Sequence, residues 1–226
     1  MSKVQVLDEG YVEYIEHWGS DERVIEAARM STNKGFMGWE TDAKLLAYLW
    51  NNQHSTPFEM GGMVLEIKAP IMVFREWQRH RAMSFNEMSA RYTPLPNENY
   101  LPTLERVMEG ANTATTNKQA QGNGASLSEA DAMKWLMYLN ESYETAQNAY
   151  EWGLSMGIPK ELARLSVPVG RYSRMRVSCN LRNWLAFLTL RQSENAQYEI
   201  RVYADEVCKL IEQHFPRTAD LFNQGK

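Results

Sequence analysis

The densest group of chemically active side chains lies between Arg79 and Tyr92, in the segment RHRAMSFNEMSARY. Its fourteen positions hold three arginines, a histidine, a glutamate, an asparagine, two serines and a tyrosine. The planar guanidinium of arginine binds phosphate or carboxylate in a bidentate manner, and serine and asparagine can complete the hydrogen bonding of a nucleotide. The segment therefore predicts an anion site, although a solvated charged turn after a helix has a similar composition.

Arginine is concentrated in two stretches of a chain whose formal net charge is −4. Ten of the fifteen arginines lie there, namely Arg75, Arg79, Arg81, Arg91, Arg164, Arg171, Arg174, Arg176, Arg182 and Arg191. The negative net charge argues against general binding of nucleic acids or of anionic membranes. An acidic chain with clustered arginines is instead a candidate for binding small anions.

Arg191 is also a candidate because of its position on an expected helix. It follows Leu188 by three residues and Trp184 by seven, which puts it on the core side of that helix. A buried guanidinium needs an acceptor, so Arg191 is a candidate functional residue. The alternative is an arginine in the last turn that only interacts with the helix dipole.

The segment 79–92 resembles the signature of the flavin-dependent thymidylate synthases, R-H-R followed by seven residues and S, often extended as N-E-x-S-x-R-Y. The similarity continues at His54–Glu59, at Glu161–Arg164, at Asn180 and Arg182, and at Leu190–Ile200. The residues that fit the signature and its extension are Arg79, His80, Arg81, Asn86, Glu87, Ser89, Arg91 and Tyr92.

The resemblance implies roles for individual residues. The side chains expected to contact FAD are Thr56, Arg79, His80, Arg81, Glu87, Asn180 and Arg182. Those expected to bind dUMP are Glu76, Arg79, Glu87, Ser89, Arg91, Arg164 and Arg191. Arg191 is the implied catalytic residue, which stabilises negative charge on the uracil ring. Glu76 stands where the family often has Gln, and no metal is implied.

The reaction implied is the reductive methylation of dUMP to dTMP, with methylenetetrahydrofolate as carbon donor and NADPH as reductant. No protein side chain supplies a hydride, so a bound cofactor, FAD, must carry it. The chain has no G-x-G-x-x-G motif, and neither Cys179 nor Cys208 lies in the arginine-rich segment. Two rivals are an NADPH-dependent flavin oxidoreductase without methyl transfer, and a helical RNA- or nucleotide-binding regulator.

The elements that must position these residues are predicted from apolar periodicity and turn signals. Strands are expected within 3–18 and at 63–69 and 171–179. Helices are expected at 21–30, 42–52, 70–80, 161–165 and 181–191, with a last one across 196–210. Another helix should begin at a capping box of Ser126 and Glu129 and end near Gly153. A loop follows Tyr92, and residues 109–125 read as a mobile surface insertion.

These elements predict an α+β fold, with a mixed sheet flanked by helices, in a single helix-rich catalytic domain over residues 1–226. A mixed α/β class is the next choice. The chain lacks the sequence of a signal peptide and any continuous apolar run long enough to span a bilayer, so a cytoplasmic protein is expected. The resemblance implies a homotetramer with sites shared between subunits.

Overall fold

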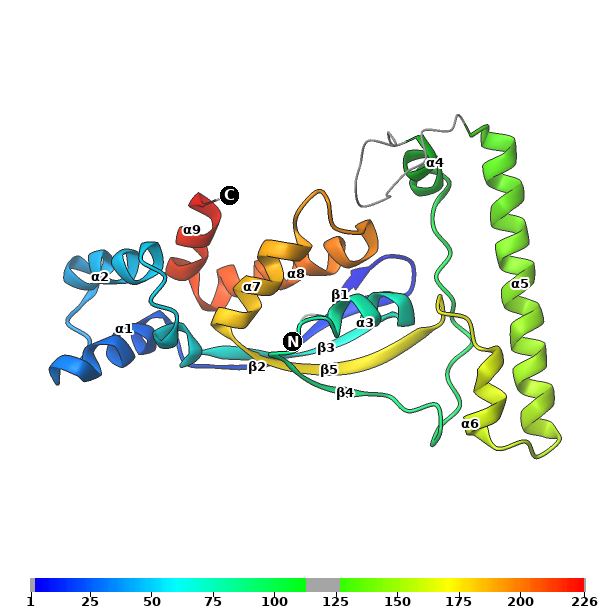
Figure 1. Ribbon diagram of the computed structural model, residues 1–226, viewed down its shortest axis with the longest axis horizontal. Helices are drawn as coiled ribbons and strands as arrows, with labels where there is room; N and C mark the ends of the chain where they lie inside the picture. The colour runs from blue at the N-terminus through cyan, green and yellow to red at the C-terminus, as the bar shows by residue number, and fades with distance from the viewer. Residues whose placement is uncertain (1–2, 113–126, 226) are drawn as a thin grey trace.

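The computed structural model describes residues 3–112 and 127–225, which form one central sheet with helices on one face and at both ends (Figure 1). The strand order is β1-β2-β3-β5-β4. The strands are β1 (Lys3–Val6), β2 (Gly10–Trp18), β3 (Gly62–Pro70), β4 (Ser84–Glu87) and β5 (Tyr172–Asn180). The α+β class is confirmed.

Every pairing between these strands is antiparallel, where a mixed sheet was expected. The connections explain the difference. Trp18, the last residue of β2, pairs with Gly62, the first of β3, so the chain returns to the end of the sheet that it left. Pro70, the last residue of β3, likewise pairs with Tyr172, the first of β5. A connection that returns to the same end must reverse the strand direction.

The core lies between one face of the sheet and three helices, α3 (Ile71–Trp77), α7 (Leu181–Arg191) and α8 (Tyr198–His214). Side chains alternate across β3, so Leu65 and Ile67 are fully buried on the helix side while Glu66 is on the other face. Trp77 of α3 and Trp184 of α7 are also fully buried, and their rings meet edge to face. The sheet and α3 therefore fix where α7 lies.

The expected elements before β3 are present. The helix expected at 21–30 is α1 (Asp21–Arg29), and that expected at 42–52 is α2, which begins earlier (Trp39–Asn51). Two short 3-10 helices, η1 (Met30–Thr32) and η2 (Thr56–Glu59), lie in the connections.

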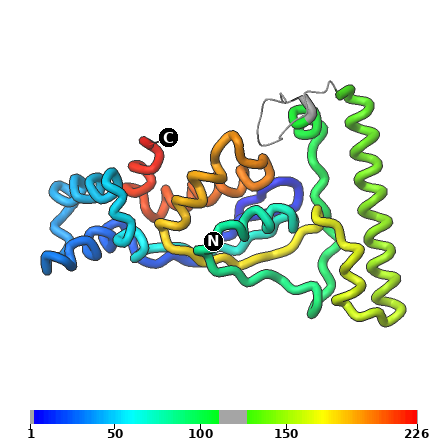
Figure 2. The backbone as a smooth tube through the Cα atoms, viewed as in Figure 1, coloured from blue at the N-terminus to red at the C-terminus, as the bar shows by residue number. Residues whose placement is uncertain are grey.

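The arginine-rich segment contains a strand that the periodicity did not predict. Helix α3 ends at Trp77, three residues before the expected His80, and the chain then turns into β4, which pairs with β5. Phe85 is the one large apolar residue of this four-residue strand, so the sequence has too little alternation to reveal it. Figure 2 shows the segment after β4 running toward α6 (Lys160–Ala163).

Part of the predicted insertion is helical. Residues 109–112 end α4 (Leu104–Asn112), which packs against the long helix α5 (Glu129–Ser155). Residues 113–126 lie outside the described part of the chain. The N-cap of α5 is Ser128, whose hydroxyl accepts from the backbone N–H of Asp131 at 3.1 Å, so a capping box at Ser126 is wrong. Ser126 and Ser128 are each followed three positions later by an acidic residue, and the second serine is the N-cap of the helix.

The C-terminal region follows the predicted order with one addition. The short helix at 161–165 is α6 followed by η3 (Arg164–Ser166), and α7 has the predicted bounds. The last predicted helix is α8, but α9 (Pro216–Gln224) follows it, begun by Pro216 at its first position. Within residues 3–112 and 127–225, no helix is both long and apolar enough to cross a membrane.

Candidate active site

Arg191, in the last turn of α7, is held by Glu76 near the end of α3 and by His80 in the turn that follows α3. Its Nε donates to Nε2 of His80 at 2.9 Å. One terminal nitrogen donates to Oε2 of Glu76 at 2.7 Å, and the other to the backbone oxygen of Glu76 at 2.9 Å. Only 16% of the Arg191 side chain is exposed. A guanidinium has five N–H donors, so three are engaged here and two remain for a ligand.

His80 is neutral in this arrangement. Burial, together with the positive charge of Arg191, lowers the pKa of His80 to about 4, although Glu76 acts in the opposite direction. Because Arg191 can only donate, Nε2 of His80 must be the unprotonated nitrogen and Nδ1 carries the proton. The ring also packs edge-on against Phe187 of α7, with the ring centroids 5.0 Å apart. The imidazole therefore has a fixed tautomer and orientation.

Three residues of the predicted dUMP set surround one cavity of about 350 Å³ near the start of β5. Glu87 ends β4, Ser89 follows it, and Arg164 begins η3. Gln78 donates to Glu87 at 3.3 Å, and burial raises the pKa of the Glu87 carboxyl. A cation and a hydroxyl at one cavity are the groups that bind a phosphate.

Ser173 of β5 lines the same cavity and was absent from the sequence-based set. Its hydroxyl is buried and makes no hydrogen bond with the residues that the structure describes, although it lies near enough to Glu87 to lower that carboxyl's pKa. The sequence held a signal for it. Ser173 occupies the core-facing register of β5, in line with the apolar Met175 and Val177. A polar residue in such a row indicates a function other than packing.

Arg91 and Arg79 lie apart from this cavity. Arg91 forms an ion pair with Glu161 of α6 at 3.3 Å, and both side chains are more than half exposed. Lys160 binds the backbone oxygen of Tyr92, which ties the same segment to α6. Arg79 is exposed after α3.

The predicted FAD-binding residues Thr56, Asn180 and Arg182 lie at the other end of β5. Asn180 pairs with Gly62 at the start of β3, and its side chain caps α7 by accepting from the N–H of Asn183 at 3.0 Å. Arg182 forms an ion pair with Glu59 of η2, which begins at Thr56. From Ser173 to Asn180, β5 spans roughly 23 Å, so the structure does not bring these residues together with the 350 Å³ cavity.

A second cavity, of about 470 Å³, adjoins these residues between η2 and α7. Arg182, His54 and Ser55 supply polar groups, while Phe58 and Leu185 supply apolar walls. Arg81 is exposed; its neighbour Ala82 accepts a weak hydrogen bond from the thiol of Cys179, at the end of β5. His54 belongs to the segment His54–Glu59, which resembles the family, but it was not among the predicted site residues.

Cys179 and Cys208 are both buried, and neither forms a disulfide. Burial raises the pKa of Cys179 to about 12, so it is not a thiolate at neutral pH. Among the residues that the structure describes, no group of three or more His, Cys, Asp or Glu side chains could hold a metal ion.

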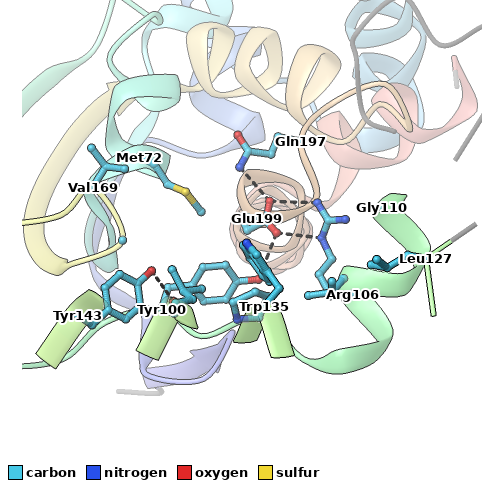
Figure 3. Close-up of a pocket in the computed structure, with 14 residues that line it drawn as sticks. Met72, Tyr100, Arg106, Gly110, Leu127, Trp135, Tyr143, Val169, Gln197 and Glu199 are labelled. Atoms are coloured by element: carbon cyan, nitrogen blue, oxygen red, sulfur yellow. Dashed lines mark hydrogen bonds and ion pairs between the residues drawn. The ribbon is translucent and has the colours of Figure 1, made fainter. Parts of the chain in front are cut away.

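A separate cavity of about 630 Å³, between α4, α5 and the start of α8, contains none of the predicted site residues (Figure 3). The carboxylate of Glu199 in its wall is buried and accepts from Arg106 at 2.9 Å, from Tyr100 at 3.1 Å and from Gln197 at 2.9 Å. The remaining walls include Trp135 and other apolar residues. Among the described residues that line this cavity, the two charged side chains, Arg106 and Glu199, are paired with each other.

Comparisons with known proteins agree on one family. The model of the thymidylate synthase complementing proteins, Thy1, matches residues 13–217. A flavin-dependent thymidylate synthase of Ehrlichia ruminantium (strain Gardel) is 38% identical over 218 residues, covering 96% of this chain and 72% of the relative. That of Pseudothermotoga lettingae is 36% identical over 219 residues, covering 97% of this chain and 92% of the relative.

A solved structure is similar over nearly the whole fold. It is the UMP/dUMP methylase PolB from Streptomyces cacaoi, bound with 5-Br dUMP. The TM-score is 0.86 at 29% sequence identity, and the match covers 98% of this chain and 97% of that chain. The likeness therefore includes the sheet and helices that carry the three groups of residues described above.

Proposed function

Because this chain belongs to the Thy1 family of flavin-dependent thymidylate synthases, we propose that it draws the carbon for dTMP from methylenetetrahydrofolate and the electrons from NADPH. The reaction itself is the FAD-dependent reductive methylation of dUMP to dTMP. The observation that carries the assignment to particular residues is the mostly buried Arg191, which keeps two N–H donors for a ligand.

FAD suits the end of the sheet where Thr56, Asn180 and Arg182 lie. An apolar cavity wall with Phe58 and Leu185 suits a flavin ring, and the exposed cations Arg81 and Arg182 suit a pyrophosphate. Arg79, His80 and Glu87 complete the proposed FAD contacts. Bound there, FAD would supply the hydride that no side chain can supply.

The phosphate of dUMP suits the 350 Å³ cavity. Arg164 and Ser89 would bind it, and Arg91 would join them by exchanging its exposed ion pair with Glu161 for the phosphate. Arg79, Glu76 and Glu87 would contact the rest of the nucleotide. Arg191 would face the uracil and stabilise the negative charge that develops when the base is activated.

We propose a homotetramer in which each site takes residues from more than one subunit. The predicted FAD residues at the end of β5 and the cavity proposed for the phosphate lie roughly 23 Å apart along that strand, so one site would take them from different subunits. Large apolar side chains are exposed beside Arg164, with Leu165 at 81% and Leu162 at 54%. Apolar residues exposed in a patch favour a subunit contact there. We also propose a cytoplasmic location, which suits two cysteines that do not form a disulfide.

The test of the function is spectroscopic and then chemical. The purified protein should show the visible absorption of bound FAD, and dUMP should perturb that spectrum. With dUMP, methylenetetrahydrofolate and NADPH it should form dTMP. Oxidation of NADPH with no dTMP formed, under any order of addition, would favour the flavin oxidoreductase alternative.

A further inference from the structure

We propose that Glu76 is a positioning residue that both orients the Arg191 guanidinium and lowers its net positive charge toward the uracil. The proposal rests on the function proposed above, in which Arg191 faces the base. It concerns a carboxylate at a position where a neutral amide could make the same hydrogen bond. Glu76 would then determine how strongly this site stabilises a uracil anion.

The contacts of Glu76 distinguish its effect on the orientation of Arg191 from its effect on the charge of the site. Its backbone oxygen binds one terminal nitrogen of Arg191 at 2.9 Å, and any residue at this position could supply that contact. Its carboxylate binds the other terminal nitrogen at 2.7 Å. A glutamine oxygen could accept the same hydrogen bond without the negative charge. The negative charge is therefore specific to a glutamate at position 76. The hydrogen bonds that orient Arg191 are not, because a glutamine at this position could make them too.

Glu76 is the one carboxylate on α3, on the turn through Met83 and on α7. Helix α8 packs on α3 and α7, and its Asp205 accepts from the side chain of Gln192 at 3.0 Å. The carboxylate bound to Arg191 is that of Glu76. The other ionisable side chains of α3, that turn and α7, apart from Arg191 and His80, are the exposed Arg75, Arg79, Arg81 and Arg182. Exposed cations are screened by solvent, so the paired carboxylate has the larger effect on the mostly buried guanidinium.

His80 does not change this balance near neutral pH, because its imidazole accepts from Arg191 in the neutral form. Arg191, Glu76 and His80 together therefore carry no net charge. Replacing the carboxylate by an amide leaves the cluster with one positive charge. A nearby positive charge favours the ionised form of an acid such as N3 of the uracil, so the base should ionise more readily.

The experiment uses the FAD-loaded enzyme with 5-fluoro-dUMP, without folate or NADPH. The fluorine NMR signal of the bound nucleotide reports ionisation at N3 as the pH is raised. Glu76→Gln should lower the pKa of the bound base by roughly one unit relative to the wild type. Its kcat should fall less than that of Glu76→Ala, since the hydrogen bond to Arg191 survives. Glu76→Ala, which loses hydrogen bond and charge, should lower kcat about tenfold.

Glu59→Gln is the matched control, because Glu59 is also paired with an arginine of α7, Arg182. It should leave the pKa of the bound base unchanged. Equal pKa values in the wild type and Glu76→Gln would overturn the proposal. If Arg191→Ala binds 5-fluoro-dUMP with an unchanged pKa, Arg191 does not face the base, and the role assigned to it fails. If the wild type does not bind 5-fluoro-dUMP, both the proposed function and this inference are wrong.

Discussion

At the scale of single residues, Arg191 combines partial burial with contacts to two other residues. His80 and Glu76 hold three of its five donors, so the guanidinium is oriented before any ligand binds. Such preorganised charge is most effective where solvent is excluded.

Replacement of Arg191 by Ala should therefore reduce dTMP formation by roughly two orders of magnitude or more, the scale for removal of one charge-stabilising donor. FAD should stay bound, which the visible spectrum would check. Arg174→Ala, an exposed arginine on the opposite face of the sheet, serves as the control and should retain activity. Unchanged turnover in Arg191→Ala would mean that Arg191 only caps its helix.

His80 gives a prediction for stability against pH. Its pKa in the folded protein, about 4, lies below the usual 6.5, so the unfolded chain binds a proton first as the pH falls. The contribution of His80 to the free energy of unfolding is fully present above pH 6.5 and is lost as the pH falls from 6.5 to 4. The loss attributable to this half-buried group should be about 1–2 kcal/mol once solvent screening is allowed for.

The measurement is urea unfolding at pH 7 and pH 4.5 for the wild type and His80→Asn. An asparagine cannot titrate, yet its oxygen can still accept from Arg191. The variant should lose less stability than the wild type between these two pH values. Equal losses of stability in both proteins would show that another group causes the loss of stability at acid pH.

At the scale of elements, Arg171 holds the loop that follows β4 against α5. Its side chain is fully buried and donates to the backbone oxygen of Pro96 at 2.7 Å, to Asn99 at 3.0 Å and to Gln147 at 2.7 Å. The same loop carries Ser89 at its start. Helix α5 is thereby coupled to the cavity proposed for the phosphate.

Replacement of Arg171 by Met should lower the free energy of unfolding by about 3 kcal/mol, because the three acceptors lose a buried charged donor. Cleavage by protease within residues 92–103 should become faster. Arg176→Met is the control, since the exposed Arg176 pairs with Glu66 at the surface. That change should cost less than about 1 kcal/mol. Similar losses in the two variants would contradict the proposed coupling.

At the scale of the whole molecule, the proposed subunit sharing can be tested with mixed oligomers. Arg164→Ala removes a residue of the phosphate cavity, and Arg182→Ala removes one of the proposed flavin residues at the far end of β5. Each variant alone should have little activity. If one site uses the two residues from different chains, some sites of a mixed oligomer are intact and activity should partly return.

Subunit exchange must be demonstrated independently, for example with two chains of different mass. No recovery after proven exchange would mean that both residues serve one site from one chain. Sedimentation of the wild type at several concentrations gives the oligomeric state itself.

The sequence alone indicated the family, a set of candidate site residues and most elements. Helix α7 has the predicted bounds because its signals are local, with Asn180 as N-cap and apolar side chains at helical spacing. The signature residues were found because they are close together in sequence. Strand β4 was missed because a four-residue strand with a single large apolar residue has no usable period.

Only the tertiary structure decided which reactive residues meet. Glu76 and Arg191 are 115 positions apart, and they pair because β3 and β5 are neighbours whose following helices, α3 and α7, pack on the same face. Strand pairing likewise placed Ser173 beside Glu87 at one cavity and Asn180 at the far end. No local spacing encodes such contacts, because they depend on the register and direction of strands distant in sequence.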